Sequence, residues 1–228
     1  MAEKQYRQHR FTREPGSTEL FVVRHGESAA VVPGRPIPSV DGQDDPALAP
    51  DGQEQARRVA ERLAGQRIDA IYITPLRRTA ETAAPLAERL GLTPRVEPDL
   101  REVFLGEWEG GEFRPRMAEG DPIGLKMLAE ERWDVIPGAE AQDAFRSRVR
   151  SGIGRVIDAH PDQRVAVFVH GGVIGELIRH AVGGGRNFAF VGADNGSISH
   201  VVVLGERWAL RRFNDTSHLS EAFDLPTP

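Results

Sequence analysis

Two short apolar runs, each followed by a histidine and a glycine, constrain the fold of this chain most strongly. The first run, Leu20-Phe-Val-Val, leads into Arg24-His-Gly, and the second, Val165-Ala-Val-Phe-Val, leads into His170-Gly-Gly. Because neither run alternates apolar and polar residues, both are typical of strands buried on both faces of a parallel sheet. Open α/β sheets bind ligands at the carboxyl ends of their strands, so we expect the two histidines to share one pocket.

Composition narrows the classes of protein to which the chain can belong. Its 228 residues, 39% of them hydrophobic, are enough for one α/β domain with a buried core. The net charge of -5 arises from acidic and basic residues scattered along the chain, which predicts no nucleic-acid partner. The absence of cysteine excludes disulfides, thiolate chemistry and cysteine-ligated zinc, and it is compatible with a reducing, cytoplasmic location.

The two ends of the chain differ from its centre. Residues 1–18 are polar and charged, which predicts a flexible N-terminal lead-in rather than a secretory signal or a membrane anchor. No apolar stretch reaches the roughly 20 residues needed to span a bilayer, so no membrane partner is expected. Residues 215–228 form a tail without a helix or strand pattern, which leaves a single domain over residues 19–214.

Strand and helix patterns alternate along this domain. The expected strands cover residues 19–25, 68–73 and 164–169, and the expected helices cover residues 51–64, 75–90, 139–159 and 173–182. A capping box, Asp51-Gly-Gln-Glu54, is expected to open the first helix. This order predicts an α/β fold, a three-layer α/β/α sandwich with a mostly parallel central sheet.

Two further segments depart from the simple alternation. The Gly205-Glu206 pair, which lies between strand patterns at residues 197–204 and 207–213, favours a type II′ turn and so an antiparallel hairpin at the sheet edge. Residues 110–138 carry charge, glycine and proline with weak periodicity. They are predicted to form an insertion or lid beside the sheet, or equally a short helical excursion.

The surroundings of His25 favour a functional role over a core position. Arg24 precedes it at a strand end, and Gly26 lets a ligand approach the backbone closely. A neutral imidazole is a competent nucleophile, and a guanidinium group holds phosphoryl oxygens through paired hydrogen bonds. His25 is therefore a candidate nucleophile or ligand-binding residue, and a metal has little support because no His and carboxylate ligand spacing lies nearby.

Four segments, in this order, resemble the histidine phosphatase superfamily of phosphoglycerate-mutase-like enzymes. They are Arg24-His25-Gly26-Glu27, Thr74-Pro-Leu-Arg-Arg78, Leu100-Arg-Glu102 with Trp108-Glu-Gly, and Val169-His170-Gly171-Gly172. Single tetrapeptides of this kind are common, but the four together span most of residues 19–204 and are highly specific. The resemblance implies the phosphoglycerate-mutase-like form of the sandwich.

The resemblance also implies a role for each matching residue. His25 would attack phosphorus and form a phosphohistidine, while Glu102 would act as general acid and then as general base. Arg24, Arg78 and His170 would complete the catalytic set. In substrate binding, the phosphoryl group would be held by Arg24, Arg78, His170 and Gly171. Arg78, rather than the adjacent Arg77, matches the phosphate-binding arginine of the family.

The implied activity needs neither a metal nor another cofactor. Its substrate would be a small phosphorylated metabolite, and inorganic phosphate would be a product. Arg35, in the loop after the first strand, is a further candidate substrate contact, although a solvated loop arginine is as plausible. Trp108, Phe113 and Trp133 would form the wall of the leaving-group pocket or simply belong to the core.

Two departures from the family's pattern bear on the reaction. Val31 stands six residues after His25, where many members have an asparagine, and His170-Gly-Gly replaces the His-Gly-Asn that is typical of mutases. These departures favour a phosphatase over a phosphoglycerate mutase. A catalytically silent member that binds a phosphorylated ligand is a third alternative, and the oligomeric state, including a homodimer, stays open.

Overall fold

A six-stranded mixed sheet forms the centre of the protein, whose computed structural model describes residues 5–220. The strands lie in the order β5-β4-β6-β1-β7-β8. The first four are mutually parallel, whereas β7 pairs antiparallel with β1, and β8 pairs antiparallel with β7. The strands are β1 (Thr18–Arg24), β4 (Ala70–Ile73), β5 (Arg95–Val96), β6 (Arg164–Val169), β7 (Ile198–Leu204) and β8 (Arg207–Asp215). The predicted fold class, with its antiparallel edge hairpin, is confirmed.

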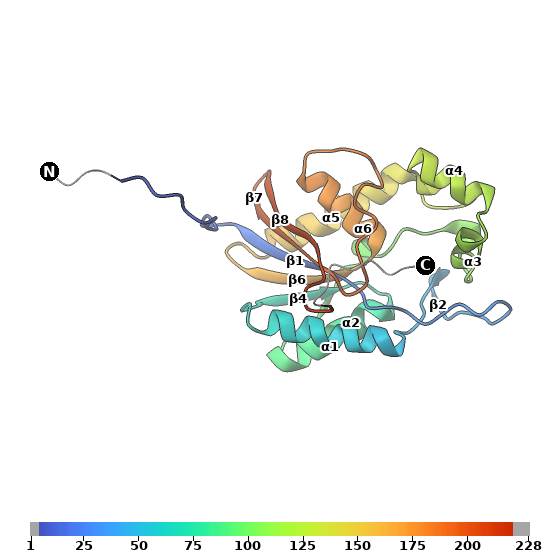
Figure 1. The fold of residues 1–228 in the computed structure, drawn as a ribbon, viewed down its shortest axis with the longest axis horizontal. Helices are drawn as coiled ribbons and strands as arrows, with labels where there is room; N and C mark the ends of the chain where they lie inside the picture. The colour runs from blue at the N-terminus through green and yellow to red at the C-terminus, as the bar shows by residue number, and fades with distance from the viewer. Residues whose placement is uncertain (1–4, 221–228) are drawn as a thin grey trace.

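Helices cover both faces of this sheet (Figure 1). Helices α1 (Pro50–Ala64) and α2 (Arg77–Leu90) lie on one face, and α5 (Gln142–Asp158) and α6 (Gly171–Ala181) lie on the other. In β1, Phe21 and Val23 belong to the hydrophobic core between the sheet and helices α1 and α2. Leu20 and Val22 belong to the core between the sheet and helices α5 and α6. Both faces of the strand are therefore buried, which explains its unbroken apolar run.

Local details depart from expectation at the start of α1. The helix begins at Pro50 after Ala49, and no side chain caps it. The expected capping box is therefore wrong, and Glu54 instead binds Arg57 and Arg58. Proline suits the first helical position because it lacks the N–H that would be left without a partner.

The turn of the edge hairpin matches its prediction. Gly205 adopts a positive φ of 56°, the conformation that the first turn position of a type II′ hairpin requires. Across this turn, Leu204 pairs with Arg207.

The segment over residues 110–138 is the predicted helical excursion. It contains α3 (Phe113–Ala118), α4 (Pro122–Glu130) and the short helix η3 (Trp133–Val135). Figure 1 shows α3 and α4 at the end of the molecule away from the β7–β8 hairpin. Its role as a lid stays a prediction. Smaller elements are β2 (Ser39–Val40), β3 (Gln43–Asp44), η1 (Pro98–Leu100) and η2 (Gly106–Trp108).

The predicted terminal segments are only partly tested. Residues 5–14 form no helix or strand, and β8 extends to Asp215, one residue beyond the predicted domain end. Residues 1–4 and 221–228 lie outside the described part of the chain.

The N-terminus of α1 packs directly on the loop that follows His25. A Cβ atom on Gly52 would lie 2.0 Å from the Glu27 carbonyl oxygen, and one on Gly26 would lie 2.4 Å from the Gly52 carbonyl oxygen. The Ala49 N–H donates a hydrogen bond to the same Glu27 oxygen at 2.9 Å. Only glycine permits this contact, so α1 fixes the path of the chain after His25.

We expect Gly52→Ala to lower the free energy of unfolding by about 1–3 kcal/mol, because its methyl group must displace backbone. Gly154→Ala is the matched control, since Gly154 is also helical but a Cβ added there would meet no heavy atom within 4 Å. That control should be neutral or stabilising by about 0.5–1 kcal/mol. Urea unfolding of both variants tests this, and equal stability of the two would contradict the packing argument.

Candidate active site

The pairing of β1 with β6 brings the two histidines together. Arg24 lies opposite Val169 in the parallel register, and the His25 N–H donates to the Val169 carbonyl oxygen at 3.0 Å. The next residue of each strand is a histidine, and their ring centroids are 5.2 Å apart. The two histidines therefore meet at the carboxyl edge of the sheet.

The hydrogen bonds of His25 define its tautomer. Its Nδ1 lies 2.7 Å from the Gly26 carbonyl oxygen, which can only accept, so Nδ1 carries the proton. The lone pair is then on Nε2, to which the Arg78 Nε–H donates at 3.3 Å. Burial, reinforced by Arg78 and Arg24, lowers the pKa of His25 well below its ordinary value. A neutral imidazole results, whose Nε2 lone pair accepts a long hydrogen bond from Arg78.

Both predicted arginines reach this point from different elements. Arg78 extends from the first turn of α2 and also donates to the Asp44 carbonyl oxygen at 2.8 Å. Arg24 donates through Nη1 to the Ala193 carbonyl oxygen, and its buried Nε has no hydrogen-bond partner in the described chain. Burial lowers the pKa of each guanidinium, whereas Glu102 raises it. Arg77 instead contacts Glu81, outside the cavity.

His170 is fully buried at the start of α6. Its Nε2 lies 3.0 Å from the Thr74 hydroxyl, while its Nδ1 has no hydrogen-bond partner within residues 5–220. Burial, followed by the positive charge of Arg78, lowers its pKa well below the ordinary value. Helix α6 begins at Gly171. This residue lies beside Arg24, since a Cβ atom added to Gly171 would be 3.7 Å from the Arg24 Nε.

Glu102 faces the histidines from the loop after η1. Its Oε1 accepts a hydrogen bond from the Val103 N–H at 3.0 Å, and its Oε2 accepts one from the Gly172 N–H at 3.1 Å. A Cβ at position 172 would lie 2.6 Å from the same carboxylate. The second glycine after His170 therefore makes room for Glu102, which is a physical reason for the His-Gly-Gly sequence.

Four of the predicted site residues line a cavity of about 200 Å³, whereas His170 and Gly171 are buried beside it and are not among its lining residues. Arg24, His25, Arg78 and Glu102 line it, and so does Val31, which occupies the place of the expected asparagine. Its other lining residues are Ser28, Ile37, Gln43, Asp44, Pro46, Val103, Leu105, Glu109, Gly111, Phe113, Arg114 and Trp133. The cavity thus has a charged end at His25 and a largely apolar wall.

The remaining loop and aromatic residues near the site differ in whether they reach this cavity. Arg35 is exposed and does not line the cavity, so its substrate contact stays a prediction. Trp133 and Phe113 line the cavity, whereas Trp108 is buried in the core. Asn195 donates through Nδ2 to the His25 carbonyl oxygen at 2.9 Å and so positions the histidine. Ser197 is buried and does not reach the cavity.

Arg114 is the cavity cation that sequence reasoning missed. It extends from α3 and donates to the Ser28 hydroxyl at 2.6 Å and to the Ala29 carbonyl oxygen at 3.0 Å. Arg116, two residues later, instead pairs with Glu112 and Asp121. No local pattern distinguishes the two arginines, because the difference depends on how α3 packs beside the first loop.

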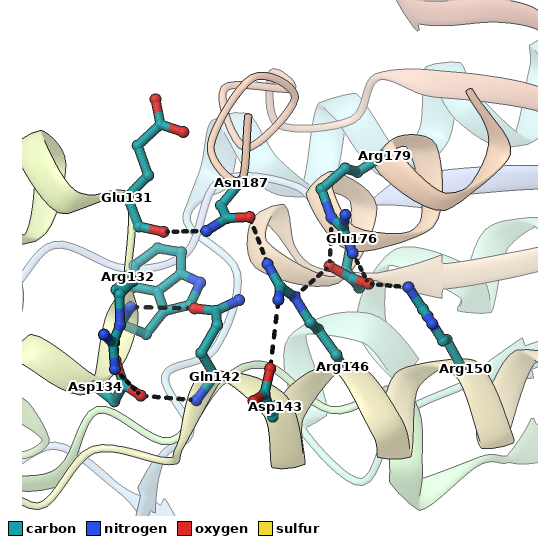
Figure 2. A network of polar contacts seen from close by, with 11 residues as sticks. Glu131, Arg132, Asp134, Gln142, Asp143, Arg146, Arg150, Glu176, Arg179 and Asn187 are labelled. Atoms are coloured by element: carbon teal, nitrogen blue, oxygen red, sulfur yellow. Dashed lines mark hydrogen bonds and ion pairs between the residues drawn. The ribbon is translucent and has the colours of Figure 1, made fainter. Parts of the chain in front are cut away.

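A polar network ties the outer wall of the cavity to the body of the protein (Figure 2). Asn187 donates to the Glu131 carbonyl oxygen at 3.1 Å and accepts from Arg146 of α5. Arg146 also reaches the buried Glu176 of α6, at 3.5 Å. The Trp133 N–H donates to Gln142 Oε1 at 3.3 Å, and its ring centroid lies 4.6 Å from that of Phe188, the residue after Asn187, so Trp133 is held at the wall.

Neither a metal cluster nor a membrane-spanning helix occurs in the described part of the chain. Within residues 5–220, no group of three or more His, Cys, Asp or Glu side chains could hold a metal ion. No helix in that range is both long and apolar enough to cross a membrane.

The fold and the cavity define an α/β protein with a cationic pocket at the carboxyl end of its parallel strands. The chain belongs to the histidine phosphatase superfamily, branch 1, whose family model matches residues 20–216. The resemblance noted from four short segments is therefore confirmed.

Named relatives include both phosphatases and mutase-like proteins. Phosphoglycerate mutase-like protein 4 of Arabidopsis thaliana is 34% identical over 89% of this chain and 87% of its own. The metal-independent phosphoserine phosphatase of the same plant is 30% identical over 89% of this chain and 84% of its own. A mycobacterial glucosyl-3-phosphoglycerate phosphatase, solved with inorganic phosphate, is 26% identical, with a TM-score of 0.69 over 89% of this chain and 99% of that one.

The depressed pKa of His170 predicts a pH dependence of stability. Below about pH 6.5 the unfolded chain binds a proton at this histidine that the folded chain does not, so stability is lost as the pH falls. When the pH falls from 7 to 5, the free energy of unfolding should decrease in wild type and in His170→Asn. The decrease should be smaller in His170→Asn by about 1–2 kcal/mol, because the variant lacks this histidine. Urea titrations measure this, with the exposed His9→Asn as control. Identical pH slopes for His170→Asn and wild type would contradict a buried neutral imidazole.

Proposed function

We propose that the protein is a metal-independent phosphatase that hydrolyses a small phosphomonoester through a phosphohistidine on His25. The observation that carries this proposal is the His25 tautomer: the Gly26 carbonyl oxygen holds the proton on Nδ1, which leaves the Nε2 lone pair beside Arg78. The lowered pKa keeps this atom unprotonated near neutral pH. Nε2 therefore attacks phosphorus, and the bond to the leaving-group oxygen breaks in line with it.

The cationic groups stabilise the charge of the transferred phosphoryl group. Arg24 has a buried Nε–H without a hydrogen-bond partner among residues 5–220, and Arg78 lies against the attacking Nε2. Such donors, already desolvated and fixed, need little reorganisation when charge develops on the phosphoryl oxygens. They lie at one end of the cavity, so the leaving group faces the apolar wall that includes Trp133 and Phe113.

Glu102 supplies the proton transfers. In the first step it would protonate the leaving oxygen, and in the second it would take a proton from the water that attacks phospho-His25. Backbone N–H groups of Val103 and Gly172 orient both carboxylate oxygens. Water regenerates His25 and releases inorganic phosphate.

Hydrolysis rather than mutase chemistry is supported by the lining of the cavity and by a related phosphatase. The cavity presents Val31 where many members of the family have an asparagine, so one polar contact to a phosphate group is missing. The related metal-independent phosphoserine phosphatase supports the same choice. Arg114 adds a further positive charge to the cavity, near His25, Arg24 and Arg78, and so strengthens the preference for an anionic substrate.

We expect wild type to hydrolyse p-nitrophenyl phosphate in the presence of a chelator. His25→Ala should lower kcat by at least about a thousandfold, as the removal of a catalytic nucleophile does. His9→Ala, at an exposed histidine, is the control and should match wild type. Comparable activity of His25→Ala and wild type would remove His25 from the mechanism.

The mutase and binding-only alternatives have their own test. Incubation with 3-phosphoglycerate and its bisphosphate should release free phosphate rather than 2-phosphoglycerate. Dominant isomerisation would instead show a mutase, and affinity for phosphate esters without turnover would show a silent member.

Thr74 is proposed to orient the proton of His170. The Thr79 hydroxyl donates to the Leu76 carbonyl oxygen at 2.8 Å, and the Thr74 hydroxyl lies within 3.1 Å of Thr79 Oγ1 and 3.0 Å of His170 Nε2. If Thr74 donates to Nε2, the proton of the neutral imidazole resides on Nδ1. That nitrogen is buried, has no hydrogen-bond partner in the described part of the chain, and can then donate to a phosphoryl oxygen.

Thr74→Val keeps the shape of the side chain and removes its hydroxyl. We expect about a tenfold fall in kcat/KM, whereas Thr74→Ser should stay within about threefold of wild type. ¹⁵N NMR of His170 provides a readout that a packing defect would not produce, since the tautomer should become mixed in the valine variant alone. An unchanged tautomer in Thr74→Val would contradict this role.

A further inference from the structure

A second cavity lies on the α1 side of the sheet, away from the catalytic residues. Its volume is about 470 Å³, and it shares no lining residue with the catalytic cavity. Its floor is formed by apolar and aromatic residues of β1 and β7, including Phe21, whose ring stacks on His200 at 4.8 Å. The floor lies toward the start of β1, whereas His25 follows its end.

Arginine dominates the walls of this cleft. The five that line it are Arg13, Arg62, Arg164, Arg211 and Arg212. Only two carboxylates, Glu19 and Asp215, line the same cleft. Three positive charges are therefore in excess, in a chain whose net charge is -5. Such a concave, one-signed region concentrates the field and attracts anions.

The two carboxylates are already engaged. Glu19 accepts from His200 at 2.8 Å and from Arg164 at 2.7 Å, and these contacts lower its pKa to about 2. Asp215 is shared between Arg62, at 3.5 Å, and Arg212, at 3.4 Å. Glu19 thus fixes the positions of His200 and Arg164 at the floor of the cleft, and it does not neutralise the other arginines.

The guanidinium groups retain donors for a ligand. Arg164 uses Nε for Glu19 and Nη1 for the Gln66 carbonyl oxygen, which leaves Nη2. Arg13 donates to the Asp162 carbonyl oxygen, which carries no formal charge. Arg211 stacks over the Phe11 ring, 3.9 Å from its centroid, and this contact leaves the edge of its guanidinium available.

We propose that this cleft binds an anionic small molecule that carries at least two phosphate groups. Phosphate oxygens match the fork of N–H donors on arginine, and two phosphate groups balance an excess of three charges better than one. The volume is sufficient for a ligand of that size. The cleft is a binding site distinct from the catalytic cavity and does not depend on the proposed hydrolysis.

Pyrophosphate is the test ligand, measured by isothermal titration calorimetry at low salt. All proteins carry Arg78→Ala, which removes a catalytic-cavity cation and so suppresses binding there. Adding Arg211→Ala and Arg212→Ala should weaken pyrophosphate binding by about tenfold or more. Adding Arg89→Ala and Lys126→Ala instead removes two exposed positive charges outside the cleft and should change binding less than twofold.

Two results would overturn the proposal. One is equal affinity with and without Arg211 and Arg212, and the other is no measurable binding of pyrophosphate to Arg78→Ala at millimolar concentration. Circular dichroism monitors folding of each variant. If the double cleft variant unfolds, Arg13→Ala replaces it, because Arg13 precedes β1 and lies outside every helix and strand. That variant should also weaken binding, and unchanged affinity would count against the cleft.

Discussion

The parallel pairing of β1 with β6 is the constraint on which the candidate site depends. It places Arg24 beside Val169, so that the residues that follow, His25 and His170, leave the sheet at one edge. A shift of one residue in this register would turn every β1 side chain to the opposite face and separate Phe21 and Val23 from their core. Burial of both faces therefore secures the geometry of the candidate site as well as the fold.

The positively charged arginines of the site are not neutralised by direct ion pairs with carboxylates. Two arginines approach two histidines in a buried space, and this arrangement keeps the histidines neutral by lowering their pKa values. Glu102 offsets part of the positive charge but makes its own hydrogen bonds to backbone N–H groups. The result is an anion pocket in which donors remain available to a phosphoryl group, which is the electrostatic requirement of the proposed reaction.

Sequence patterns were sufficient where a local rule governs the structure. Unbroken apolar runs located β1 and β6. The choice of Arg78 over Arg77 came from the family resemblance, and Arg78 does lie against His25. Sequence patterns failed where contacts between distant segments of the chain determine the structure. The start of α1 depends on its contact with Glu27, and the place of Arg114 depends on how α3 lies against the first loop. Neither the anchoring of Trp133 by Gln142 and Phe188 nor the arginine-lined cleft has a signal in local sequence.

The central claim is that phosphate passes through His25. Rapid quenching of Glu102→Gln with p-nitrophenyl phosphate tests it most directly, because this activated leaving group needs little acid assistance while loss of the general base slows release of phosphate. Peptide mass spectrometry under alkaline conditions should locate a phosphohistidine at His25. The absence of a phosphoenzyme, or its location at His170 or any other residue, would contradict the account.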